Sequence, residues 1–509
     1  MEILFVVLLV TICIAALIRS LILRSRIGKK LPPGPSFLYT TFLMLTNSVF
    51  DLEPILVRLK AKYGPFITLP IVFNPSFFVG CHSLAHEILI QNGALCSDRP
   101  KTLPVLHIST SPYGPTWRIL RRNLASEIMN PYRIKSYSWA RKWVLCNLTD
   151  KLQEHVASED GIKVIDYFHH AMFSLLVSMC FGNKLDEGCI KEIAKVQADM
   201  QNVIGRFRML AMFPRLGKIL LRKSWKEFDR VSKNKEQVFI PIIKSRIESA
   251  KQNVAYVDTL ANIQLPQEEA RNGDSRKLTY KEMADMCSEF FNAGTETATI
   301  ALHWIMANLV KYPHIQSKLY DEILTVVGSP PPLPRKGVEL ESVINEDNIQ
   351  NMSYLKAVVL EGLRRHSPSH FLLPHSVTKD AEVQGYTIPQ GATINFLVAE
   401  MGLDPKVWDD PMEFKPERFL STYGSKVVFD ITGNKEIKMI PFGAGRRICP
   451  GYELALLHLE YLVANLIWYF HWTTPHGGHV DLSEKTEFFA TMKNPLITRI
   501  SLRNQRRTT

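Results

Sequence analysis

The stretch PFGAGRRICPGYELALLHLE, Pro441 to Glu460, places a single cysteine, Cys449, between a glycine-rich loop and an apolar helical run. Glycines let backbone N–H groups approach a sulfur atom, and those groups stabilise its anion. A helix that begins near Gly451 adds the positive end of its dipole at the same place. The stretch therefore predicts a stabilised thiolate, and the alternative is an inert structural cysteine.

The composition and net charge of the chain limit which kinds of binding partner are expected. Its 509 residues are 46% hydrophobic and carry a net charge of +12, which favours a nucleic acid, an anionic membrane or an acidic protein as partner. Nucleic acid is the weakest of these, because zinc-ligand spacing, RNA-binding aromatic signatures and long Lys/Arg blocks are missing. None of the eight cysteines forms a C-x-x-C pair, and several lie in apolar runs, as expected in a reducing compartment.

The N-terminus has the composition of a membrane anchor. ILFVVLLVTICIAALI, Ile3 to Ile18, contains one polar side chain, and its extension to Leu23 reaches the roughly 20 residues that a bilayer span needs. A cleaved signal peptide is the alternative, but the only charge before the run is acidic and no convincing cleavage site follows. We expect a membrane anchor over 1–23, a basic and Pro-rich hinge over 24–35, and a single domain over 36–509. The basic residues after the run predict that this domain is cytosolic.

The sequence after the hinge predicts a mainly α fold with small β-sheets. The segment TYKE, Thr279 to Glu282, is a capping box, and no proline follows until Pro313. A helix over Tyr280 to Lys311 would be about 48 Å long and could cross a whole domain. Short strands are predicted in PFITLPIVFNPSFFVG, AEVQGYTIPQGATINF and FFATMKNPLITRIS.

The spacing Phe442-x-x-Gly445-x-Arg447-x-Cys449-x-Gly451 resembles the haem-binding loop of the cytochrome P450 superfamily. The resemblance implies that Cys449 binds the iron of haem b as a thiolate, within a loop closed by Gly451. Phe442 would shield the sulfur from solvent. Arg447 would pair with a haem propionate, since a guanidinium suits a planar carboxylate. A P450 fold, preceded by one transmembrane helix, is the corresponding expectation.

Further elements resemble the same family and appear in the family's order. Glu361-x-x-Arg364 is common as a surface ion pair, but here FKPERF, Phe414 to Phe419, follows it. The family pattern then implies a buried triad of Glu361, Arg364 and Arg418. It also implies that Trp117, Arg121 and His375 lie at the haem propionates; alone, they would be an amphipathic helix face and a structural histidine.

The predicted long helix carries AGTETAT, Ala293 to Thr299, which resembles the oxygen-activation motif. Gly294 would let the backbone approach the haem plane without a Cβ clash. Thr297 would bond to a helix carbonyl and open a groove, and Glu296 with Thr297 would relay protons. A threonine-rich packing contact is the alternative.

The resemblance covers nearly the whole chain and implies a membrane-anchored haem-thiolate monooxygenase. Its electrons would come from NADPH through a flavoprotein, the cytochrome P450 reductase, and its place would be the endoplasmic reticulum membrane, single-pass. LLPHSVTKD and MIPFGAGRRICPG resemble the eighty-nine family of plant enzymes, which implies a lipophilic secondary metabolite as substrate. An O2-independent isomerase or dehydratase and a non-catalytic haem-binding membrane protein are the alternatives. The segment Lys101 to Pro112 is shorter than the family's usual one, which puts substrate recognition and activity in question.

Overall fold

The computed structural model describes residues 30–46, 52–71, 75–100, 105–156, 158–182, 184–211, 222–249, 254–266, 275–421, 427 and 429–503, with isolated positions between 10 and 21. Its longer helices are α2 (Phe37–Thr46), α3 (Leu52–Tyr63), α5 (Pro115–Asn123), α7 (Ser138–Gln153), α8 (Ile165–Phe181), α9 (Glu187–Ala211), α11 (Arg222–Glu248), α13 (Tyr280–Lys311), α14 (Pro313–Val327), α16 (Ser353–Arg365) and α18 (Tyr452–Tyr469). Short helical segments are α4 (His82–His86), η2 (Glu87–Gln91), η3 (Leu124–Ile128), α6 (Pro131–Ser136), α12 (Tyr256–Leu260), α15 (Glu346–Gln350), α17 (Val398–Gly402), η4 (Pro416–Phe419), η5 (Gly445–Arg447) and η6 (Pro475–Gly477).

The strands form small sheets rather than one central sheet. The largest has the order β1-β2-β9-β6, with β1 (Phe66–Leu69), β2 (Ser76–Val79), β9 (Thr393–Phe396) and β6 (His375–Ser376). A three-stranded sheet joins β10 (Phe470–Thr473), β13 (Ile497–Leu502) and β3 (Ile162–Lys163). Three hairpins pair β4 (Gln264–Pro266) with β5 (Ser275–Lys277), β7 (Ala381–Val383) with β8 (Tyr386–Ile388), and β11 (Glu484–Thr486) with β12 (Ala490–Met492). Strands therefore form in all three stretches that the sequence predicts.

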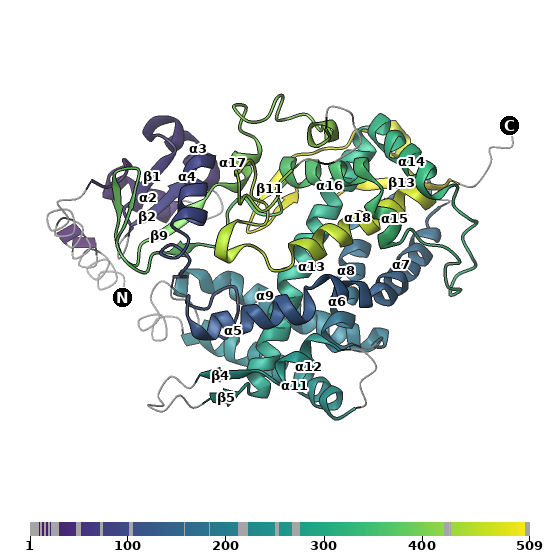
Figure 1. Ribbon diagram of the computed structural model, residues 1–509, viewed down its shortest axis with the longest axis horizontal. Coiled ribbons are helices and arrows are strands. Elements are labelled where there is room, and N and C mark those ends of the chain that lie inside the picture. Colours follow the sequence, from purple (N-terminus) through teal and green to yellow (C-terminus); the bar gives the residue numbers. More distant parts are fainter. Residues whose placement is uncertain are drawn as a thin grey trace.

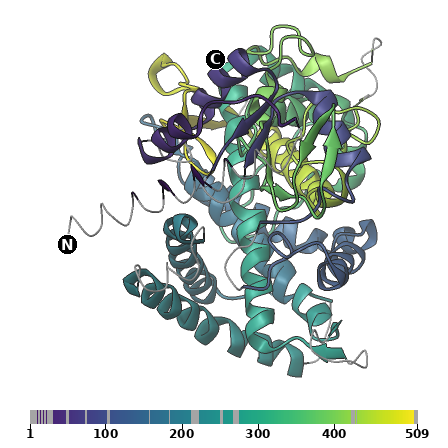
Figure 2. The same cartoon turned by 90° about the vertical axis from the view of Figure 1, so that its left-hand side faces the viewer.

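Helix α13 organises the molecule. It begins as predicted, because the Thr279 side chain accepts from the Glu282 N–H at 3.2 Å while the Glu282 carboxylate accepts from the Thr279 N–H at 2.8 Å. Figure 1 shows α13 in the middle of the molecule, where it packs against α8, α18, α11 and α16. In Figure 2 the same teal helix runs as a long column through the body. The prediction of a helix that crosses the whole domain is confirmed.

The N-terminal part closes one side of the body. Strands β1 and β2, drawn in purple on the left of Figure 1, pair with the green strand β9, which comes from much later in the chain. The proline-rich stretch before α2 is attached to this sheet, because Thr68 donates from its N–H to Pro33 O at 3.0 Å and from its hydroxyl to Pro32 O at 2.7 Å. The end of the predicted hinge is thus docked on β1 instead of standing free.

The membrane anchor expected over 1–23 lies mostly outside the described residues. Among the residues that the structure does describe, no helix has both the length and the apolar character needed to cross a bilayer.

Candidate functional site

The loop that carries Cys449 is held by its own backbone. The Cys449 N–H donates to Phe442 O at 2.8 Å, and the Ile448 N–H donates to Gly445 O at 3.1 Å. Gly445 has φ +69°, and a Cβ there would stand 2.1 Å from Leu89 O. Only glycine tolerates both the backbone conformation and this approach, so the loop is seated against η2. This seating fixes the position from which the Cys449 sulfur projects.

The Cys449 thiol experiences opposing influences. Burial raises its pKa, while the backbone N–H of Gly451 and the charge of Arg121 lower it, with a net upward direction. The loop thus provides the stabilising groups expected from the sequence, but they do not outweigh burial. A bound metal ion removes a thiol proton outright, so this arrangement suits a metal ligand better than a free nucleophile.

Arginine side chains surround the loop on the side of α5. Arg121 donates from Nη2 to Ile448 O at 2.6 Å, next to the cysteine. The Arg447 guanidinium lies 4.3 Å from the centroid of the Trp117 ring. Burial, with a smaller contribution from the Arg121 charge, lowers the pKa of Arg447 to about 10, although Asp98 acts in the opposite direction. The structure therefore brings Trp117, Arg121 and Arg447 together.

A further arginine, Arg99, joins this cluster and is not among the site residues that the sequence predicts. It donates from Nε to Ser109 O at 2.8 Å and from Nη1 to Leu373 O and Pro374 O. Burial and the nearby Arg447 lower the pKa of Arg99 to about 9. His375 is buried next to them, with Nδ1 at 2.8 Å from Cys96 O, and burial together with the Arg99 charge lowers its pKa to about 3. The signal in the sequence was an arginine in the segment SDRP, between the first sheet and the Trp117 helix.

These groups fit a haem. Arg99, Arg121, Arg447 and His375 lie in one partly buried region, where burial and mutual repulsion disfavour their charged forms. The two carboxylates of a porphyrin would relieve that repulsion and accept bidentate hydrogen bonds. In the middle of α13, whose other residues are mostly buried, Ala293 is exposed and Thr297 is half-buried. An apolar disc that covers this face would bury them. Cys449 would hold the iron, and the arginines, Trp117 and His375 would hold the carboxylates.

Two neighbouring side chains of the motif on α13, Thr297 and Glu296, can exchange protons. Thr297 donates its hydroxyl proton to Ala293 O at 2.7 Å, so its oxygen remains free to accept from a water molecule. Glu296 lies 2.9 Å from Nε2 of His169, which projects from α8 and is partly exposed. His169 was not recognised from the sequence, because only the packing of α8 on α13 places it there.

Gly294 lies where α13 packs against α8. A Cβ at this position would meet Cδ1 of Leu176 at 2.7 Å, and Leu176 belongs to α8. The missing side chain therefore permits the close packing of α8 on α13. The predicted approach of the Gly294 backbone to a haem plane stays a prediction.

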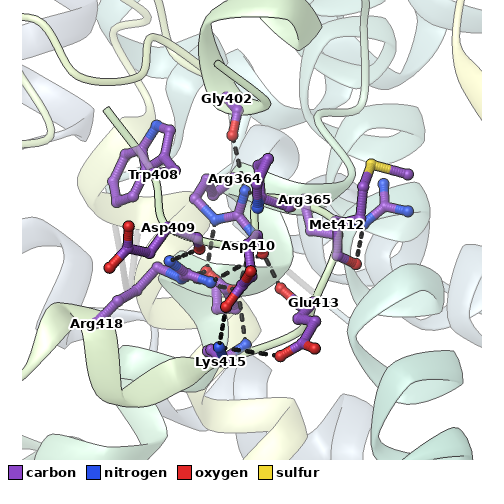
Figure 3. Close-up of polar contacts among 12 residues, drawn as sticks. Arg364, Arg365, Gly402, Trp408, Asp409, Asp410, Met412, Glu413, Lys415 and Arg418 are labelled. Atoms are coloured by element: carbon purple, nitrogen blue, oxygen red, sulfur yellow. Dashed lines mark hydrogen bonds and ion pairs between the residues drawn. The ribbon is translucent and has the colours of Figure 1, made fainter. Parts of the chain in front are cut away.

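The structure also brings together Glu361, Arg364 and Arg418. Arg364 makes a two-pronged contact with the buried Glu361 carboxylate, at 2.7 Å from Nε and 2.8 Å from Nη2, and Arg418 Nε reaches the same carboxylate at 3.2 Å. Figure 3 shows the surroundings of this triad, in which Arg364 also donates to Gly402 O and Glu413 O. Such a network fixes the geometry of the segment before the cysteine loop more than it adds net stability.

The fold and this site define a class, the haem-thiolate cytochromes P450. Residues 32–499 match the family Cytochrome P450, and the chain belongs to that family. Membership implies haem iron as the prosthetic group and an oxidoreductase of the monooxygenase kind.

Within the family, the chain is similar to plant proteins. It is 46% identical to cytochrome P450 89A9 of Arabidopsis thaliana over 481 residues, which cover 92% of each chain, in agreement with the resemblance to the eighty-nine family. It is 28% identical to the sarpagan bridge enzyme of Gelsemium sempervirens, over 94% of this chain and 93% of that one. Among solved structures, a zebrafish cytochrome P450 with progesterone superposes with a TM-score of 0.72 at 21% identity, covering 89% of this chain and 100% of that one. That likeness establishes the mainly helical P450 fold.

Proposed function

We propose that this protein is a membrane-anchored monooxygenase that inserts one oxygen atom of O2 into a lipophilic plant secondary metabolite. Its two electrons come from NADPH through a flavoprotein reductase. The single observation that carries the proposal is Cys449 on a fixed loop next to the cluster of Arg99, Arg121 and Arg447. Bound there, a thiolate-ligated haem supplies the activation of O2.

Residues of this chain hold a water molecule in place and transfer protons. Thr297 Oγ1, with its proton held by Ala293 O, accepts a hydrogen bond from water and keeps that water at the face of α13. Glu296 exchanges protons with the partly exposed His169 and passes them toward Thr297. This pair distinguishes the proposal from an isomerase or dehydratase, which needs no protons for O2 chemistry.

A basic surface next to the cysteine loop supports the reductase as partner. Arg118, Arg122 and Arg446 are exposed, and Arg118 and Arg446 both lie over the ring of Tyr113, at 5.1 and 5.8 Å. Arg446 also donates to the Tyr113 hydroxyl at 2.7 Å. A positive surface steers encounter with an acidic flavoprotein.

Exposed side chains of helix α2 support our proposal that the protein is located at the endoplasmic reticulum membrane, with its body on the cytosolic side. Leu38 is 73% exposed and Phe42 is 60% exposed, on the helix that follows the docked proline stretch. Apolar side chains at this place suit contact with lipid next to the anchor.

The test uses the full-length protein in microsomes with a plant reductase. We expect the red-shifted Soret band of the reduced carbon-monoxide complex that defines the family, and NADPH consumption that depends on both reductase and O2. A haem protein without that band would refute the thiolate ligand. The band without O2-dependent NADPH consumption would instead favour the isomerase or dehydratase.

A further inference from the structure

The described residues just before Tyr113, 105–112, are held in place by one glutamate. Lys101 to Pro104 lie outside the described residues, but 105–112 contain a tight turn over 108–110, which the Ser111 N–H closes by donating to His107 O at 3.0 Å. The Ile108 N–H donates to Glu289 Oε2 at 2.6 Å, and the Ser109 N–H donates to Glu289 Oε1 at 2.7 Å. One carboxylate thus holds two consecutive backbone donors of the turn.

Glu289 belongs to α13 and shares its face with the oxygen motif. Glu289, Ala293 and Thr297 follow one another at intervals of four residues, so they lie along one side of the helix. Each interval rises about 6 Å, which puts Glu289 about 12 Å from Thr297 along the axis. The turn held by Glu289 therefore stands beside the face where the substrate must meet the oxygen.

The opposite side of the turn is held by the arginine cluster. Arg447 donates to Ile108 O at 3.2 Å and to Ser111 O at 2.8 Å, and Arg99 donates to Ser109 O. Ile108 is buried in the main core, and Val105 packs against the small cluster between α9 and α11. The turn is consequently clamped between α13, the cysteine loop and the α9–α11 pair.

We propose that Glu289 is the positioning residue that makes this short turn a fixed wall of the ligand space, and thereby a determinant of which ligands fit. This inference rests on the proposed function. A carboxylate suits this role, because hydrogen bonds to an ionised group are about twice as strong as neutral ones.

The test compares Glu289→Gln with wild type in the haem-loaded, full-length protein. Glutamine keeps the shape but offers one acceptor oxygen and turns an NH2 group toward the second backbone donor. We expect hydrogen exchange of the Ile108 and Ser109 amides to accelerate about tenfold or more. Glu289→Asp, which keeps the charge but is one methylene shorter, should accelerate it too. Glu339→Gln makes the same chemical change at an exposed ion pair with Lys142 and should leave this segment unchanged.

The functional readout is the affinity ratio of two haem-binding azoles, imidazole and the larger 4-phenylimidazole, measured by optical titration. Loosening the wall should raise the relative affinity for the larger azole in Glu289→Gln, with the carbon-monoxide band unchanged. Unaltered exchange in both Glu289 variants would overturn the clamp. Faster exchange with an unaltered azole ratio would overturn the role in selectivity. Absence of the carbon-monoxide band in the wild type would refute the proposed function instead, and so separates the two failures.

Discussion

Stability above neutral pH should depend on one largely buried histidine, His370, whose side chain is 11% exposed. Its Nδ1 contacts the Glu53 carboxylate of α3, and its Nε2 lies 2.9 Å from Glu484 Oε2 on β11. These two carboxylates outweigh burial and raise the pKa of His370 to about 9. Hydrogen bonds from His366 and His370 outweigh burial at Glu484 and lower the pKa of its carboxyl to about 2. His366 itself stays neutral at pH 7, because burial lowers its pKa to about 4.

The two pKa shifts stabilise the folded protein in different pH ranges. A raised histidine pKa contributes stability that is complete below pH 6.5 and is lost as the pH rises through 9. The lowered Glu484 pKa contributes stability that is present above pH 4.5 and is lost as the pH falls through 2. A shift from 6.5 to about 9 corresponds to about 3 kcal/mol at pH 6 and almost nothing at pH 10. The same ion pairs underlie both shifts, so the two contributions are not added.

The assay is thermal unfolding of wild type and His370→Gln at pH 6 and pH 10. At pH 6 the variant should be destabilised by about 3 kcal/mol, which for a chain of this size lowers the midpoint by about 3 °C. At pH 10 the difference between the two proteins should nearly vanish. His476→Gln is the control, since His476 is exposed and lies 3.9 Å from an exposed aspartate. A His370→Gln deficit of equal size at both pH values would refute the reasoning.

Four further perturbations test the proposed chemistry. Cys449→Ser should abolish the red-shifted carbon-monoxide band, because a hydroxyl supplies no anionic sulfur ligand, and persistence of the band would exclude Cys449 as the ligand. Thr297→Ala should keep haem but uncouple turnover, with several-fold more peroxide per NADPH; unchanged coupling would remove Thr297 from proton delivery. Arg122→Glu should slow reductase-driven reduction and flatten its salt dependence, whereas equal slowing with dithionite would show an effect on the haem itself. Deletion of 1–23 should release the protein from membranes only in part, and full retention after a carbonate wash would indicate a second span.

Sequence patterns predicted the features that are formed by residues close together in the chain. The cysteine loop, the capping box that starts α13 and the short strands each consist of neighbouring residues, and all of them form where expected. The resemblance also grouped Glu361 with Arg418, although each alone has the appearance of a surface charge.

What the sequence could not predict depends on contacts between distant segments. Glu289 and His169 carry no local signal, because their roles arise when α13 meets the 105–112 turn and α8. The contact that a Cβ at Gly294 would make with Leu176 also joins positions more than a hundred residues apart in the chain. Packing decides such roles, and periodicity does not reveal which side chain a helix face will meet.

Because β2 pairs with β9, strand β2 remains without its partner during much of the synthesis of the chain. Residues 76–79 leave the ribosome roughly 300 residues before their partners at 393–396, an interval of about 15 to 60 s at ordinary rates of translation. Throughout that time the antiparallel pair of β1 and β2 presents an apolar, unpaired edge close to the nascent N-terminus, where strands of neighbouring chains could add. A chaperone that covers this edge during synthesis would therefore raise the yield of folded protein more than one that acts after chain release.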